Sequence, residues 1–171
     1  MTRVKNVVDG PTDLDRVWGL RDDYYRLFMA GYRRALGNLD AVLVELCRVR
    51  VAQMVESSFD LSVRYSRAIE AGLREEKVAA LSDYPTSPLF TDRERTALEF
   101  TEQWVIQSSS ITDEDVERLL TALSPEEFIY FCKALSVMDQ FARANAIFAI
   151  EPAHAVPQTM PDFALAQTAA A

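Results

Sequence analysis

Four residues near the middle of the sequence carry side chains that can move a proton and hold a charged group. Glu45 is followed after eleven residues by Ser57, and then by Asp60 and Arg64. Placed on one helix with 3.6 residues per turn, Ser57, Asp60 and Arg64 share a face that borders the apolar core. The pattern predicts acid–base chemistry: Glu45 or Asp60 would transfer the proton, and Arg64 would bind a carboxylate or enolate. Burial and the charge of Arg64 would set the pKa of the carboxyl group.

Three further residues are candidates for contact with a substrate. Tyr65 follows Arg64 and would supply a hydrogen bond, as Ser57 would. Tyr24 belongs to an aromatic group near Trp18 that either packs in the core or forms one wall of a pocket. His154 is the single histidine and lies in the C-terminal segment, so it reaches a pocket only if that segment folds over it.

The same residues have a purely structural interpretation. Ser57 would cap a helix, a role worth about 1 kcal/mol. Asp60 and Arg64 are spaced as an i,i+4 ion pair, worth about 0.2–0.5 kcal/mol on an exposed helix. Glu45 would be bound by Arg48 or by another helix. The sequence leaves both interpretations open.

The helical wheel also predicts which residues of this segment face inward. The core-facing arc holds Leu61, Tyr65, Ala68 and Ile69. Phe59 and Val63 fall on the opposite side, and an apolar i,i+4 pair there predicts a contact between subunits.

The elements that would position these residues are helices. About seven or eight are predicted, over residues 14–20, 22–36, 41–55, 58–71, 75–81, 92–107, 113–122 and 125–149. Thr91 and Glu94 form a capping box, and Ser124 with Pro125 marks the start of the last helix. That last helix is apolar nearly all round, which predicts burial within the protein or between subunits. No part of the sequence shows the alternating pattern of a β-strand, so the predicted class is all-α.

Composition limits the class of protein. The chain has 171 residues, 49% of them hydrophobic, and a net charge of −8. We expect a single domain over residues 1–171, with a core at 12–152 and an extended tail at 153–171. The negative charge argues against a nucleic-acid or membrane-surface partner, because both need a basic face. The N-terminus lacks the apolar core of a signal peptide, which favours the cytoplasm.

Cysteine and histidine usage argues against redox and metal chemistry. Cys47 and Cys132 are the two cysteines and lie far apart in the sequence. Neither has a second thiol nearby to form a disulfide during turnover. One histidine and scattered acids give no metal-ligand spacing, so we expect neither a metal nor another cofactor.

Several passages together resemble the carboxymuconolactone decarboxylase family, which includes the alkylhydroperoxidase D-like proteins. The similar passages are RVAQMVESS, RAIEAGLREEKVAAL, SPLFTDRERTALEFTEQW and the stretch from ITDEDVERLL through FARANAIFAIEP. They extend over about residues 15–152. The resemblance implies an all-α helical domain that assembles as dimers, trimers or hexamers.

The resemblance also shows what this chain lacks. Redox members of the family carry Glu, then Cys-x-x-Cys after eleven residues, then His after three more. That spacing matches Glu45, but it places Ser57 and Asp60 at the cysteine positions and Arg64 at the histidine position. Peroxidase activity is therefore not implied.

Three functions remain to be weighed. The first is a cofactor-independent acid–base enzyme acting on a small carboxylated or lactone-type molecule by decarboxylation, isomerisation or ring opening or closing. The second is a non-catalytic ligand-binding or assembly protein with the same fold. The third, a thiol peroxidase that uses Cys47 or Cys132, has the weakest support.

Overall fold

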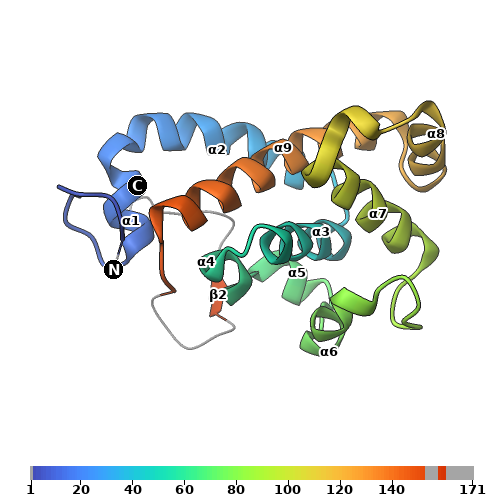
Figure 1. Cartoon of the computed structure of the whole chain (residues 1–171), viewed down its shortest axis with the longest axis horizontal. Helices are drawn as coiled ribbons and strands as arrows, with labels where there is room; N and C mark the ends of the chain where they lie inside the picture. The colour runs from blue at the N-terminus through green and yellow to red at the C-terminus, as the bar shows by residue number, and fades with distance from the viewer. Residues whose placement is uncertain (1, 153–157, 161–171) are drawn as a thin grey trace.

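The computed structural model describes residues 2–152 and 158–160, and this part of the chain is helical, as predicted (Figure 1). Its elements in order are α1 (Asp13–Trp18), a 3₁₀ segment η1 (Gly19–Arg21), α2 (Asp22–Leu36), α3 (Ala41–Met54), α4 (Ser58–Ser62), β1 (Val63–Tyr65), α5 (Ser66–Glu70), α6 (Glu75–Ala79), η2 (Ala80–Asp83), α7 (Asp92–Gln107), η3 (Ser108–Ser110), α8 (Asp113–Ala122), α9 (Pro125–Phe148) and β2 (Gln158–Met160). The all-α prediction is confirmed.

Local sequence signals start the helices where they were expected. Asp40 caps α3 by accepting a hydrogen bond from the Leu43 amide. The side chains of Thr91, Thr112 and Ser124 each begin a helix with a reciprocal capping box. Each such cap satisfies amide groups that have no partner within the helix.

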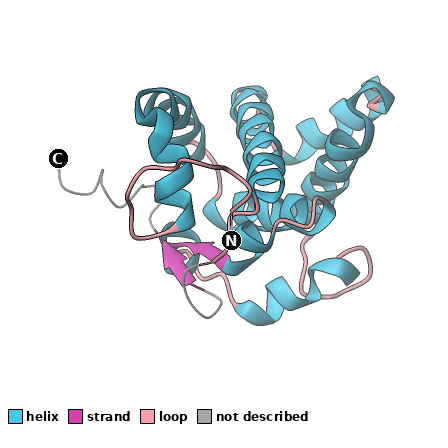
Figure 2. Cartoon of the chain, turned by 60° about the vertical axis from the view of Figure 1, so that its left-hand side comes forward, coloured by secondary structure: helices cyan, strands magenta, loops and turns pink. Residues whose placement is uncertain are grey.

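Helix α3 is the centre of the packing. It lies against α7 on one side and α9 on another, while α2 runs beside α9 (Figures 1 and 2). Its residues from Leu43 to Val49 are all buried, as are Val51 and Ala52. A helix that is enclosed on every side must also bury its polar residues, and α3 buries two charged ones, Glu45 and Arg48.

Helix α9 is buried on one face within the chain and exposed on the other. Phe131, Leu135 and Phe141 lie on a buried face, but Ile129 and Ile147 are exposed. Burial of α9 on all sides within the chain is therefore wrong, and burial of its outer face between subunits stays a prediction. The sequence of α9 contains apolar residues on its outer face as well, and hydropathy alone does not separate the two faces.

The predicted continuous helix over 58–71 is wrong. Helix α4 ends at Ser62, three residues of β1 follow in extended conformation, and α5 begins at Ser66. The strand β1 pairs in parallel with β2, with Val63 opposite Gln158 and Tyr65 opposite Met160. Parallel partners come from distant parts of the sequence, which explains why no local alternation revealed them.

The break changes which side chains of this segment are buried. Phe59 and Val63 lie in the core, so the predicted subunit contact at these residues is wrong. Tyr65 and Ala68 are buried as predicted, but Leu61 is half-buried and Ile69 is exposed. Because the chain leaves helical geometry at Val63, one helical wheel cannot describe both halves.

The helices give no membrane-spanning candidate. Within the described ranges, none combines the length and the apolar character that crossing a bilayer requires.

Candidate functional site

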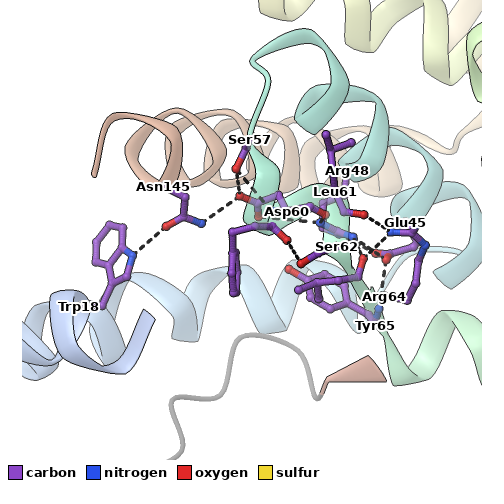
Figure 3. A network of polar contacts seen from close by, with 12 residues as sticks. Trp18, Glu45, Arg48, Ser57, Asp60, Leu61, Ser62, Arg64, Tyr65 and Asn145 are labelled. Atoms are coloured by element: carbon purple, nitrogen blue, oxygen red, sulfur yellow. Dashed lines mark hydrogen bonds and ion pairs between the residues drawn. The ribbon is translucent and has the colours of Figure 1, made fainter. Parts of the chain in front are cut away.

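The end of α4 and the extended turn of β1 that follows it are stabilised by side chains that bind their carbonyl groups (Figure 3). Ser62 Oγ donates to the Phe59 carbonyl at 2.6 Å. Arg48 Nη1 donates to the Asp60 carbonyl at 2.8 Å, and Arg64 Nη1 donates to the Leu61 carbonyl at 2.9 Å. A continuing helix would use these carbonyls for its own amides, so the side-chain donors compete with it and end α4.

Glu45 and Arg48 form a buried ion pair beneath this turn. Both oxygens of Glu45 accept from Arg48, with Nε and Nη2 each at 2.8 Å. The backbone amide of Tyr65 donates to Glu45 Oε1 at 3.1 Å. The two side chains are 1% and 2% exposed. Glu45 therefore binds Arg48, as the structural interpretation predicted, and it also holds the last residue of β1.

Asp60 is a buried carboxyl group with neutral hydrogen-bond donors. It is 3% exposed. Its Oδ2 accepts from Ser57 Oγ at 2.6 Å and from Asn145 Nδ2 at 3.0 Å, while Arg48 Nη1 lies 3.8 Å from Oδ1. Burial raises the pKa of the Asp60 carboxyl above its ordinary value, and the charge of Arg48 and the two hydrogen bonds oppose that rise.

Trp18 determines how Asn145 faces Asp60. Trp18 Nε1 lies 3.0 Å from Asn145 Oδ1. An indole N–H is only a donor, so the amide atom it meets must be the oxygen. The Asn145 nitrogen is thereby directed to Asp60. Helices α1, α4 and α9 each contribute one residue to this chain of hydrogen bonds (Figure 3).

Arg64 lies apart from the two acids it was expected to serve. The predicted i,i+4 pair with Asp60 is wrong, because Arg64 belongs to β1 and not to a continuing helix. Its Nε lies 2.9 Å from Glu75 Oε1 instead. The remaining donors of Arg64 bind the carbonyls of Leu61 and Val63. The guanidinium is thus occupied within the chain.

The other candidates are distributed around the network. Ser57 caps α4, with the Asp60 amide 3.4 Å from its Oγ, and it touches the Asp60 carboxyl as well. Tyr65 is buried with Arg48 Cζ 4.8 Å from its ring centre. Tyr24 is 52% exposed and lines a pocket beside Trp18, away from the acids. His154 lies outside the described residues.

Sequence reasoning missed two members of the network. Arg48 was considered only as a partner of Glu45, yet it joins Glu45, Asp60 and the turn. Its signal was a cation within an otherwise apolar stripe of α3. Asn145 is fully buried on the inner face of α9. A lone amide among aromatic and aliphatic residues was the corresponding signal, because a buried amide needs partners.

The cysteines are poorly placed for thiolate chemistry. Burial raises the pKa of the Cys47 thiol to about 12. Burial also raises the pKa of Cys132, which is half-buried on α9. Among residues 2–152 and 158–160, no three His, Cys, Asp or Glu side chains gather closely enough to hold a metal ion.

Comparison with known proteins gives the relationships of the chain. The model of the carboxymuconolactone decarboxylase family matches residues 22–103. The uncharacterized protein YnjA of Escherichia coli (strain K12) is 27% identical over 120 residues, which are 70% of this chain and 66% of that protein. The chain thus spans just under two thirds of the length of this relative.

Solved structures share the fold. A protein of unknown function from Agrobacterium tumefaciens, a proposed antioxidant defence protein of the AhpD type, has a TM-score of 0.71 at 18% identity, covering 89% of this chain and 98% of its own. A variant of the debrominase Bmp8 in complex with 2,3,4-tribromopyrrole has a TM-score of 0.68 at 16% identity, covering 82% and 76%. At these identities the likeness concerns the fold.

Proposed function

This chain is a member of the carboxymuconolactone decarboxylase and alkylhydroperoxidase D-like family, and from that membership we propose that it is a non-redox acid–base enzyme. Its substrate would be a small carboxylated or lactone-type molecule, and Asp60 would transfer the proton. The reaction would be a decarboxylation, an isomerisation or the opening or closing of a ring. No metal or organic cofactor takes part in this proposal.

The observation that carries the proposal is the environment of Asp60. Its carboxyl replaces a thiol of the redox motif, is buried, and has a raised pKa. A carboxyl group whose pKa is moved toward neutrality is a better proton donor and acceptor near pH 7 than an ordinary aspartate. Ser57 and Asn145 hold it in one orientation. Orientation of this kind is what proton transfer to a bound molecule needs.

The roles of the other two candidates change in this proposal. Glu45 is fully bonded to Arg48 and to the Tyr65 amide, so it positions the turn and does not transfer a proton. Arg64 is bonded to Glu75 and to two carbonyls, so we no longer assign it to the substrate carboxylate. The debrominase of the same fold is bound to a small ring compound, which supports a substrate of that size.

Solvent deuterium provides the test. The protein is incubated in D₂O with a panel of small lactone carboxylates and enolisable acids, and NMR follows deuterium uptake, ring opening and loss of CO₂. We expect turnover of at least one compound, and we expect Asp60→Asn to lower it by about 10²-fold or more, the usual loss for a general acid or base. Asp139→Asn is the matched control, because it makes the same change at a partly exposed carboxylate of α9 that pairs with Arg143. Turnover that persists in a folded Asp60→Asn variant would refute the role of Asp60.

A second candidate function is a non-catalytic ligand-binding or assembly protein. The observation that favours it is the complete internal pairing of Glu45 and Arg64, since both have partners without any ligand. This function would be favoured if the protein turned over none of the lactone carboxylates and enolisable acids but bound one of them, and if Asp60→Asn left that binding unchanged. A thiol peroxidase is disfavoured, because the raised thiol pKa values of Cys47 and Cys132 leave little thiolate at neutral pH.

A further inference from the structure

A pocket with a volume of about 290 Å³ lies beside α1. None of the residues that line it belongs to the segment 45–64, which contains the redox-motif positions. The aromatic residues Trp18, Tyr24 and Phe148 line it. They come from α1, α2 and the end of α9, so the pocket forms only when these helices have packed. We propose that this pocket binds a small, uncharged, flat aromatic molecule of one or two rings. The inference stands apart from the proposed function, because it requires no chemistry at Asp60.

The size of the pocket restricts the occupant. Pockets for small molecules usually measure about 300–1,000 Å³, and this one lies just below that range. It is too small for a helix or for an extended peptide with several side chains. A molecule of one or two fused rings fits that space.

The lining determines the chemical class. Besides the three aromatic rings, Val4, Val17 and Leu20 contribute aliphatic surface. The one charged residue is Arg21, and its guanidinium already pairs with Asp23 at 2.9 Å. Aromatic walls favour flat ligands through offset stacking and edge contacts. Without an unpaired charge or a set of polar groups, the lining selects against a strongly charged ligand.

The wall of the pocket is already held in place. The Trp18 ring lies 5.1 Å from Phe141 in a stacked arrangement and 5.8 Å from Phe148 in an edge arrangement, measured between ring centres. Its Nε1 is bonded to Asn145. Because these contacts already fix the Trp18 side chain, ligand binding restricts its motion little further, and less binding free energy is lost to ordering. The same bond connects the pocket to the Asp60 network.

The two tryptophans of the chain make the test direct. Trp18 lines the pocket, while Trp104 lies on α7 and packs against Phe100. The indole N–H region of a ¹⁵N NMR spectrum therefore has two signals, and the loss of one in Trp18→Phe assigns them. Unlabelled 2-naphthol is the probe. We expect it to shift the Trp18 signal in a saturable way and to leave the Trp104 signal unchanged.

Two variants and a second probe complete the experiment. Leu20→Glu places a charge in the lining at a side chain that is 40% exposed, and we expect it to weaken binding at least about tenfold. Leu27→Glu is the matched control at a 76% exposed leucine of α2, and binding should be unchanged. Decahydro-2-naphthol keeps the carbon skeleton without the flat rings and should bind several-fold more weakly.

Other results would overturn the proposal. One is a Trp18 signal that does not move up to the solubility limit of 2-naphthol, and another is equal binding by Leu20→Glu. A Trp18 signal that shifts with protein concentration alone would assign the surface to a second copy of the chain. A Trp18 signal that shifts when residues 161–171 are removed, with no probe present, would assign it to that segment.

Discussion

Arg48 and Arg64 donate to one and the same oxygen, the carbonyl of Val63, at 2.6 Å from Arg48 Nη2 and 2.7 Å from Arg64 Nη1. Two guanidinium groups so close together repel each other unless anions compensate for them. Each has its own carboxylate: Glu45 for Arg48 in the core, and Glu75 for Arg64 near the surface. The extended turn after α4 is therefore held by two ion pairs of very different burial.

The first prediction follows from that difference. Arg48→Met leaves the buried Glu45 without its cation, and we expect the free energy of unfolding to fall by about 3–5 kcal/mol. Urea denaturation measures it. Arg26→Met removes an exposed pair with Asp22 and should cost less than about 1 kcal/mol. Replacing Glu45 and Arg48 together by Met should restore part of the loss, and a single-variant loss below about 1 kcal/mol would contradict the prediction.

The second prediction concerns pH. The pKa of Asp60 is raised in the folded chain, so the folded state keeps this proton to a higher pH than the unfolded state does. The resulting stabilisation is fully present below the ordinary pKa of aspartate and is lost as the pH rises through the folded-state value. The stability of the wild type relative to Asp60→Asn should therefore increase on acidification, by at most about 1.4 kcal/mol per pH unit.

A control with the opposite sign is available for the pH experiment. Thr112 lowers the pKa of the partly buried Asp115 through hydrogen bonds from its amide and hydroxyl. The contribution of Asp115 to stability is lost as the pH falls. The free energy of unfolding of the wild type relative to Asp115→Asn should therefore fall on acidification. If this difference changed with pH in the same direction and to the same extent for Asp60→Asn and Asp115→Asn, the assignment for Asp60 would be wrong.

The third prediction concerns the thiols. Cys47 is buried, with a thiol pKa raised to about 12, whereas Cys132 is half-buried. We expect a thiol reagent to label Cys132 first in the native protein and to label Cys47 only when the chain unfolds. Mass spectrometry of the labelled peptides distinguishes the two. Rapid native labelling in a Cys132→Ala variant would show that Cys47 is accessible.

The fourth prediction concerns two left-handed backbone positions. Glu56 has φ +55° in the break after α3, and Gly72 has φ +99° after α5. Glu56→Gly should stabilise the protein by about 0.5–1 kcal/mol, because glycine adopts positive φ without steric cost. Gly72→Ala should destabilise the protein. No heavy atom lies within 4 Å of the added Cβ, so the loss would come from the backbone conformation and not from a steric clash with a neighbour. Thermal unfolding of the two variants in opposite directions would confirm both.

The helix starts could be predicted from sequence because their causes are local. A Thr, Ser or Asp cap and an acid three residues later act within one turn, so residues such as Thr91 and Ser124 identify helix starts without tertiary information. The end of α4 at Ser62 could not be predicted in this way. The donors that end it include Arg48, which comes from a different helix.

The candidate site shows the same difference between local features, which the sequence reveals, and contacts between distant residues, which it does not. Glu45, Ser57 and Asp60 were singled out because they fall at the spacing of the family's redox motif, and the structure places all three around one turn. The partner of Arg64 was mispredicted because Glu75 belongs to another element, α6. The orientation of Asp60 depends on Asn145 and Trp18, which bond to each other but lie 127 positions apart in the sequence. Such contacts have no signal in the spacing of residues.

The separation of Asp60 and Asn145 has a consequence for how the protein is made. The two residues lie 85 positions apart in the chain. At a synthesis rate of about 5–20 residues per second, Asp60 exists for roughly 4–17 s before Asn145 has been added to the nascent chain. During that interval the carboxyl has Ser57 as a neighbour but lacks its amide partner, and water can bond it in place of α9. The environment that raises the pKa of Asp60 is therefore completed late in translation, when α9 leaves the ribosome.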